Sequence, residues 1–259
     1  MYQEIFYTIS NGIATITLNR PQVFHALNKA LLSELFDAFN SAKNNSEVRV
    51  IILAATGDKA FCSGADLTEF GDGTLNVRER LTSLYNPLIM LMREIPKPII
   101  CQLNGVAAGA GCSLVLACDI IIASEKAIIS EMFVGIGLVI DAGSSFFLPR
   151  AVGSFRAFEL ASTGRKITAK ECLELGLATQ VVAKDDLEKE VLSLASKYAA
   201  GPTLAIGLIK HMLNQSSHSD LASMLALETD CQEKASRTHD FMEGATAFLE
   251  KRTPLFKGK

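Results

Sequence analysis

Residues 104–111, Asn-Gly-Val-Ala-Ala-Gly-Ala-Gly, connect the apolar run 98–103 to a run of small residues, 111–117. This order predicts a buried strand that turns sharply into a helix. A second turn, residues 61–66, reads Phe-Cys-Ser-Gly-Ala-Asp. Small residues let a ligand approach the backbone, and two free N–H groups aimed at one point stabilise an oxyanion. When either turn is taken alone, close packing of a helix against a strand is the favoured interpretation.

Strand and helix signals alternate on both sides of these turns. The apolar runs 7–10 and 13–18 bracket Asn-Gly, the pair that favours a tight hairpin. Helical spacing marks 31–39 and 78–94, and after Pro202 the chain reads as almost wholly helical. This pattern predicts an α/β or α+β core followed by a helical C-terminal module. We place the boundary between residues 1–200 and residues 201–259.

Composition and charge exclude several classes of protein. The 259 residues are 49% hydrophobic, so a sizeable core is available, and the net charge of −3 gives no support to nucleic-acid binding. The six cysteines form no C-x-x-C pair, so we expect no metal site. The first residues lack a signal-peptide pattern, and the longest apolar stretch, 114–123, is too short to span a bilayer. We therefore expect a cytoplasmic protein without membrane contact.

Five motifs, in their order along the chain, resemble the crotonase (enoyl-CoA hydratase/isomerase) superfamily. They are Asn19-Arg20-Pro21, Ala26-Leu27-Asn28, residues 61–66, residues 104–111 and Leu116-Ala117-Cys118-Asp119. The resemblance runs from about residue 5 to residue 257. It implies an α/β fold, in which a spiral of ββα repeats in residues 1–200 binds acyl-CoA and residues 201–259 form a helical trimerisation module. It also implies a homotrimer or a hexamer (a dimer of trimers), and an acyl-CoA thioester substrate that brings its own coenzyme A, with no further cofactor.

The resemblance also implies which residues form the site. The backbone N–H groups of Ala65 and Ala110 match the two oxyanion-hole donors. The residues that match substrate- or CoA-binding positions are Arg20, Phe24, Ala26, Ala60, Ser63, Gly64, Asp66, Leu67, Gly109, Phe133, Phe248 and Lys251. The last two match a pair that commonly meets CoA from a neighbouring subunit. For Lys251, a solvated cation at a helix end is the alternative.

The two glutamates of the superfamily's hydratases have no counterpart in this chain. The matching positions hold Ser113 and Phe133, although a shift of register by two residues would bring in Glu131. Addition of water across a double bond needs one group to activate the water and another to deliver a proton. We therefore expect little hydratase activity.

Asp141 is the remaining candidate for a catalytic carboxyl. Its surroundings, residues 135–145, read Gly-Ile-Gly-Leu-Val-Ile-Asp-Ala-Gly-Ser-Ser. The residue pattern alone favours an N-cap of the next helix. The resemblance implies instead the single catalytic acid of several isomerases, and residues 137–150 are especially similar to phenylacetate-pathway enzymes that convert a ring epoxide to an oxepin and shift enoyl double bonds. A lone carboxyl in an apolar pocket suits proton transfer, because desolvation raises its pKa.

Our preferred interpretation is an acyl-CoA isomerase with Asp141 as its base. An enoyl-CoA hydratase or another lyase of the superfamily is one alternative, and a non-catalytic acyl-CoA-binding trimer is a second. An aroyl-CoA dehalogenase, with Asp141 as nucleophile, is disfavoured because the chain has no Trp. His25 is expected at the surface or near the nucleotide. Further candidates for the acyl pocket, each as open to an ordinary core role, are Phe70, Tyr85, Leu88, Met90, Phe133 and Phe146.

Overall fold

The computed structural model describes residues 2–70 and 76–259. Its strands are β1 (Ile5–Ser10), β2 (Ile13–Leu18), β3 (Val50–Ala55), β4 (Ala60–Cys62), β5 (Ile99–Leu103), β6 (Val106–Ala108), β7 (Ile120–Ser124), β8 (Ile128–Ser130), β9 (Ile167–Thr168) and β10 (Gln180–Val182). Its α-helices are α1 (Lys29–Asn44), α2 (Val77–Arg80), α3 (Asn86–Glu94), α4 (Ala110–Leu116), α5 (Ser144–Val152), α6 (Ser154–Thr163), α7 (Ala169–Glu174), α8 (Leu187–Ala200), α9 (Thr203–Ser216), α10 (Leu221–Ser236) and α11 (His239–Glu250). The described part of the chain is thus a mixed α/β structure that ends in helices.

The strands form two sheets. The larger sheet has the order β1-β2-β3-β5-β7-β10, and the smaller one has the order β4-β6-β8-β9. Successive units place one strand in the large sheet, the next strand in the small sheet, and then a helix: β3, β4 and α2; β5, β6 and α4; β7, β8 and α5. The chain therefore winds as a spiral of ββα units, which confirms the expected fold class.

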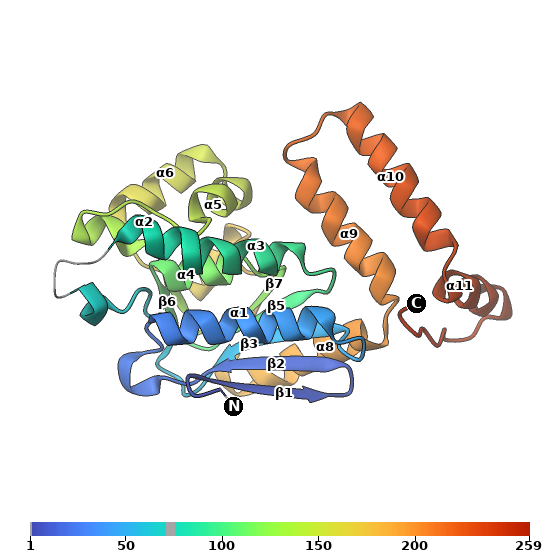
Figure 1. Ribbon diagram of the computed structural model, residues 1–259, viewed down its shortest axis with the longest axis horizontal. Coiled ribbons are helices and arrows are strands. Elements are labelled where there is room, and N and C mark those ends of the chain that lie inside the picture. The colour runs from blue at the N-terminus through green and yellow to red at the C-terminus, as the bar shows by residue number, and fades with distance from the viewer. Residues whose placement is uncertain (1, 71–75) are drawn as a thin grey trace.

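The large sheet is covered by helices on both faces (Figure 1). On one face Ile51 and Leu53 of β3 join the core that α1 and α3 complete. On the other face Ile52 of β3 and Ile100 of β5 pack with Val191 of α8. Parallel strands that are buried on both faces read as continuous apolar runs, which is why these segments show no polar alternation.

Local signals account for several element ends. Asn11 and Gly12 adopt the positive φ values, 52° and 78°, that a tight hairpin between β1 and β2 requires. The Asn28 side chain accepts a hydrogen bond from the Leu31 N–H at 2.8 Å and caps α1. The region 78–94, expected as one helix, instead contains a π-helical turn, η3 (Leu81–Tyr85), between α2 and α3.

Helices α9, α10 and α11 follow the core and extend from one end of it (Figure 1). A buried ammonium group ties α9 to the core: Lys210 Nζ donates to the Met92 carbonyl at 2.8 Å and pairs with Asp119 Oδ2 at 2.7 Å. The prediction that residues 201–259 serve trimerisation stays a prediction. Among the described helices, none has both the length and the apolar composition to cross a bilayer.

Candidate active site

The two glycine-rich turns lie against each other. Strands β4 and β6, which lead into them, pair in parallel in the small sheet. A Cβ on Gly64 would lie 2.7 Å from the Ala108 oxygen and 3.4 Å from the Ala110 nitrogen, and a Cβ on Gly111 would lie 2.8 Å from the Cys62 Sγ. Any side chain at Gly64 or Gly111 would therefore push the turns apart. The glycines serve close packing, and the same packing brings Ala65 and Ala110 to one place.

Ala65 and Ala110 each follow a glycine with positive φ: 93° at Gly64 and 53° at Gly109. Within the described residues neither the Ala65 nor the Ala110 N–H donates a hydrogen bond to a protein atom. Both residues line one cavity of about 220 Å³. The structure thus gathers the two predicted donors at one pocket, and their function as an oxyanion hole stays a prediction.

The cavity is mainly apolar and has walls from distant parts of the sequence. The two turns form one wall, α2 and η3 another, and a 3₁₀ turn, η4 (Met132–Ile136), with the loop before α5 forms the rest. The predicted site residues that line it are Ser63, Gly64, Ala65, Leu67, Gly109, Ala110, Phe133 and Asp141. A pocket that is apolar with a few polar groups is typical of small-molecule sites.

Asp141 faces this cavity and does not cap a helix. The N-cap residue of α5 is Gly143, and no side chain caps that end of the helix. Asp141 Oδ1 is buried and has no hydrogen-bond partner among the described residues. Burial raises the pKa of Asp141 to about 6. The N-cap interpretation is therefore wrong, and the carboxyl is available at the pocket.

The two hydratase positions hold no acid in the described pocket. Phe133 lines the cavity, and its ring lies against Gly109. Ser113 is fully buried, and its hydroxyl lies 3.0 Å from the Asp141 carbonyl oxygen. Glu131 is also fully buried and is not part of the cavity wall, so the alternative register does not bring it into the site. Among the described lining residues Asp141 is the single carboxyl.

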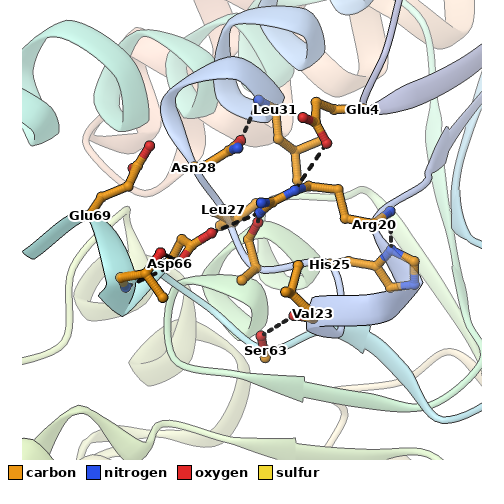
Figure 2. Close-up of polar contacts among 12 residues, drawn as sticks. Glu4, Arg20, Val23, His25, Leu27, Asn28, Leu31, Ser63, Asp66 and Glu69 are labelled. Carbon is orange, nitrogen blue, oxygen red and sulfur yellow. Dashed lines mark hydrogen bonds and ion pairs between the residues drawn. The ribbon is translucent and has the colours of Figure 1, made fainter.

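Arg20 and Asp66, both expected to bind CoA, bind each other (Figure 2). Arg20 Nη1 lies 3.0 Å from Asp66 Oδ2, and Arg20 Nε lies 3.0 Å from Glu4 Oε2. The Arg20 guanidinium also donates to the Ala26 carbonyl. Burial acts to raise the pKa of Asp66, but hydrogen bonds from Thr68 and Arg20 outweigh it and hold that pKa below its usual value. The pair fastens the turn at residues 61–66 to the segment that follows β2.

The other expected CoA-binding residues near this pair differ in exposure. Phe24 is exposed at a left-handed backbone position with φ of 53°, whereas Ala26 and Ala60 are buried. His25, expected at the surface, is 2% exposed. Its Nε2 lies 3.0 Å from the Thr56 carbonyl, and its Nδ1 accepts from the Arg20 N–H. The surface location expected for His25 is therefore wrong, because the αL turn folds its ring inward, and a location near the nucleotide stays a prediction.

Phe248 and Lys251 lie away from the cavity of their own chain. Both belong to the end of α11, and the Phe248 side chain is 82% exposed. In Figure 1 α11 and the pocket-lining α2 lie toward opposite ends of the long axis. A contact between these residues and the ligand of this cavity therefore requires a second subunit.

Sequence reasoning missed Arg80, which lines the cavity and pairs with Glu69. Its position in a helix next to a π-turn carried no sequence signal.

Of the six candidates for the acyl pocket, Tyr85 and Phe133 line the cavity, Leu88 is core, Met90 is exposed, Phe146 packs against Phe147, and the Phe70 side chain lies outside the described part. Among the described residues no group of three or more His, Cys, Asp or Glu is arranged to hold a metal ion.

Solved structures share this architecture. A crystal structure of an enoyl-CoA hydratase from Bacillus anthracis matches with a TM-score of 0.93 and 35% identity, over 99% of this chain and 100% of that one. A structure of a putative enoyl-CoA hydratase/isomerase from Mycobacterium abscessus matches with a TM-score of 0.94 and 32% identity, over 98% of this chain and 100% of that one. The architecture is therefore the crotonase fold.

Sequence relatives agree with the fold. The family model for enoyl-CoA hydratase/isomerase matches residues 8–259. A probable enoyl-CoA hydratase of Rhodobacter capsulatus is 40% identical over 258 residues, which is 100% of this chain and 99% of that protein. A 1,2-epoxyphenylacetyl-CoA isomerase of Escherichia coli is 36% identical over 263 residues, which is 100% of each chain. The chain belongs to the enoyl-CoA hydratase/isomerase family and is an enzyme of that family.

Proposed function

We propose that this enzyme is an acyl-CoA isomerase that shifts a double bond, or opens a ring epoxide to an oxepin, with Asp141 as its single base. The observation that carries the proposal is the position of Asp141: among the described lining residues it is the only carboxyl at the cavity where the two turns meet. Serine and phenylalanine occupy the two hydratase positions, which leaves no second acid for the addition of water. The similarity to a 1,2-epoxyphenylacetyl-CoA isomerase supports the same choice.

The double-bond shift needs one base and one site for negative charge. The Asp141 carboxylate takes a proton from C2 of a 3-enoyl thioester, and the electron pair moves onto the thioester oxygen. The N–H groups of Ala65 and Ala110 hold the resulting dienolate oxygen. The protonated Asp141 then returns the proton to C4, and the electrons flow back to form the conjugated 2-enoyl thioester. No atom is gained or lost, so no second substrate is required.

The apolar wall assists this chemistry in two ways. It keeps Asp141 poorly solvated, which raises the pKa of that carboxyl to about 6 and strengthens it as a base. It also excludes the water that would otherwise compete for the conjugated product. Phe133, in place of a second acid, closes the wall beside Gly109.

Asp141→Asn is the variant that tests this proposal. With a 3-enoyl-CoA substrate we expect conversion to the 2-enoyl product to fall about 10²–10⁴-fold, because the general base is lost. CoA-thioester affinity is expected to stay within about threefold, since the amide keeps the shape of the carboxyl. Asp58→Asn is the control, because Asp58 is an exposed aspartate whose partner is Lys184. Unchanged turnover in D141N would overturn the assignment.

A 2-enoyl-CoA substrate separates this proposal from its alternatives. The absorbance of the conjugated thioester should persist in the presence of enzyme. Rapid loss of that absorbance would indicate hydration and would favour the activity named for the Rhodobacter capsulatus relative. Binding of both thioesters without conversion of either, and without conversion of a ring-epoxide thioester, would leave a non-catalytic acyl-CoA-binding protein.

Assembly is part of the same proposal. The enzyme forms a homotrimer, or a hexamer built as a dimer of trimers, in which Phe248 and Lys251 of one chain reach the CoA held by another. Their exposure in the single chain and their distance from its own cavity support this arrangement. Coenzyme A arrives as part of the substrate and no further cofactor takes part. A cytoplasmic location stays a prediction.

A further inference from the structure

A fully buried carboxyl lies behind the catalytic cavity and takes no part in the proposed reaction. Glu131 precedes η4 and is 0% exposed. Its Oε1 lies 2.8 Å from Ser144 Oγ and 3.3 Å from Cys112 Sγ, while its Oε2 is buried without a partner among the described residues. A buried carboxyl in such a position costs free energy unless it is neutral or well hydrogen-bonded.

A chain of short contacts connects Glu131 to the backbone of Asp141. Ser144 Oγ lies 2.8 Å from Ser113 Oγ, and Ser113 Oγ lies 3.0 Å from the Asp141 carbonyl oxygen. Ser113 belongs to α4 and Ser144 begins α5. The chain therefore joins three separate elements and ends on the loop that carries the catalytic carboxyl.

The hydrogen atoms available for this chain of hydrogen bonds can be counted. The three oxygen–oxygen contacts of 3.0 Å or less each need one hydrogen: Glu131 to Ser144, Ser144 to Ser113, and Ser113 to the Asp141 carbonyl. Each serine hydroxyl supplies one hydrogen, and a carbonyl oxygen supplies none. The third hydrogen must come from Glu131. With a neutral Glu131 every contact is a hydrogen bond that runs in one direction, toward Asp141.

We propose that Glu131 is a positioning residue that acts as a neutral carboxylic acid, whose hydroxyl completes the hydrogen-bond chain through Ser144 and Ser113 and fixes the loop that carries Asp141. When Glu131 ionises, Ser144 turns its hydrogen toward the carboxylate. Ser113 then has one hydrogen for two acceptors, and the Asp141 carbonyl loses a full hydrogen bond. The expected effect of Glu131 on the reaction rate rests on the proposed role of Asp141, whereas the neutral state of Glu131 does not.

The groups that face Glu131 favour its neutral form. Burial raises the pKa of Glu131 to about 7, and the Asp141 charge adds to the shift, although the hydrogen bonds that Ser144 and Cys112 would donate to the ionised carboxylate oppose it. Burial also holds the pKa of the Cys112 thiol well above its usual value, so Cys112 stays a donor, and Cys172 of α7 lies beyond it. No cation pairs with Glu131 among the described residues. Arg165 follows Gly164, which lies beside the Glu131 carbonyl oxygen, but its guanidinium pairs with Glu159 and Glu171.

Infrared spectroscopy tests the protonation state without any assay of turnover. In the Asp141→Asn background, where Asp141 cannot contribute, we expect the carbonyl band of a protonated carboxylic acid at pH 6. The band should disappear in the double variant D141N/E131Q. In D141N it should fade as the pH rises, at a pH somewhat below the pKa of about 7 that Glu131 has beside a charged Asp141. Absence of the band from D141N at pH 6 would overturn the proposal, whatever the fate of the Asp141 assignment.

The pH dependence of kcat tests the effect on the reaction. Glu131→Gln keeps a hydrogen-bond donor and cannot ionise, so we expect kcat near pH 7 to stay within about threefold and the decline at alkaline pH to vanish. Glu131→Ala removes the donor, so kcat should fall about tenfold near pH 6, where Glu131 is neutral, and should show no further alkaline decline, while KM stays nearly constant. An alkaline decline that survives in E131Q would contradict the proposal, since a residue needed only for packing would not change the profile.

Ser113→Ala provides the matched control for the chain of hydrogen bonds between Glu131 and Asp141. It removes the link between Glu131 and Asp141 and leaves both carboxyls in place. If the coupling runs through Ser113, Glu131→Ala should cost much less activity in the S113A background than in the wild type. Fully additive losses would show that Glu131 acts by another route. Because E131Q preserves volume, this variant keeps the proposal testable even if E131A does not fold.

Discussion

Asp141 occupies an apolar cavity without a hydrogen-bond partner for its Oδ1 among the described residues, and this arrangement costs folding free energy. Folding raises the pKa of Asp141 from 3.8 to about 6, because burial disfavours the charged form. Between these values the folded chain binds more protons than the unfolded chain. The contribution of Asp141 to the free energy of unfolding therefore falls as the pH rises through this window. Stability therefore does not explain the position of Asp141, which fits its proposed role as a base.

The Asp141→Asn variant should therefore be inactive yet more stable. Above about pH 7 we expect its free energy of unfolding to exceed that of the wild type by about 1–2 kcal/mol, with the partial exposure of the site reducing the gain. Below about pH 3 the two proteins should be equal, because the wild-type carboxyl is then protonated in both the folded and the unfolded state. Urea unfolding over this pH range measures the difference. Identical curves at all pH values would mean that the carboxyl is solvated.

At the scale of elements, the site depends on two turns that touch through glycines. Gly64 combines a φ of 93° with a backbone neighbour 2.7 Å from its missing Cβ. Gly57 has a φ of 73° but nothing within 4 Å. The two glycines thus share the left-handed conformation and differ only in the space around them, which makes them a matched pair for substitution.

Comparing Gly64→Ala with Gly57→Ala separates the effect of backbone strain at positive φ from the effect of steric contact with the neighbouring turn. Backbone strain alone should cost each variant about 1 kcal/mol of stability, because a side chain is disfavoured at positive φ. Only G64A should also shift the Ala65 and Ala110 turns apart, and we expect its kcat to fall about 10²-fold, the effect of losing an oxyanion donor. Chemical denaturation and the isomerase assay measure the two effects. Equal activity in both variants would contradict a role for the paired turns in catalysis.

At the scale of the molecule, the spiral core carries the cavity, and α9 to α11 extend from it (Figure 1). Large apolar side chains remain exposed on these helices, including Leu213 at 66%, Leu221 at 75% and Phe248 at 82%. Exposed apolar surface of this kind marks interaction sites. It fits the proposed assembly, in which the C-terminal helices meet other subunits.

Lys251→Gln tests whether one subunit completes the site of another. We expect KM for a CoA thioester to rise about tenfold, through loss of a charge-assisted hydrogen bond, while kcat stays the same. Lys170→Gln serves as the control, because Lys170 is an exposed lysine on α7. Sedimentation must show the same assembly in both variants. An unchanged KM in K251Q assemblies of normal size would exclude the contact.

Local patterns in the sequence determined much of this protein. Asn11-Gly12 marked the first hairpin, apolar runs marked the buried strands, and small residues marked both turns, because hydrophobic period and allowed φ are properties of a few neighbouring residues. The π-turn escaped detection because its residues continue a helical pattern. The order of the motifs also identified the family and selected Asp141 and the two alanines as candidates.

Only the tertiary structure determined which side chains from distant parts of the sequence contact one another and which of them face the cavity. It showed that Asp141 faces a cavity and caps no helix, that Arg20 is bound to Asp66, and that Glu131 lies behind the wall that Phe133 forms. These outcomes depend on the strand order of two sheets, which brings together segments tens of residues apart. No local period encodes that order, and the pKa of a carboxyl follows from the burial and charges that the assembled fold provides.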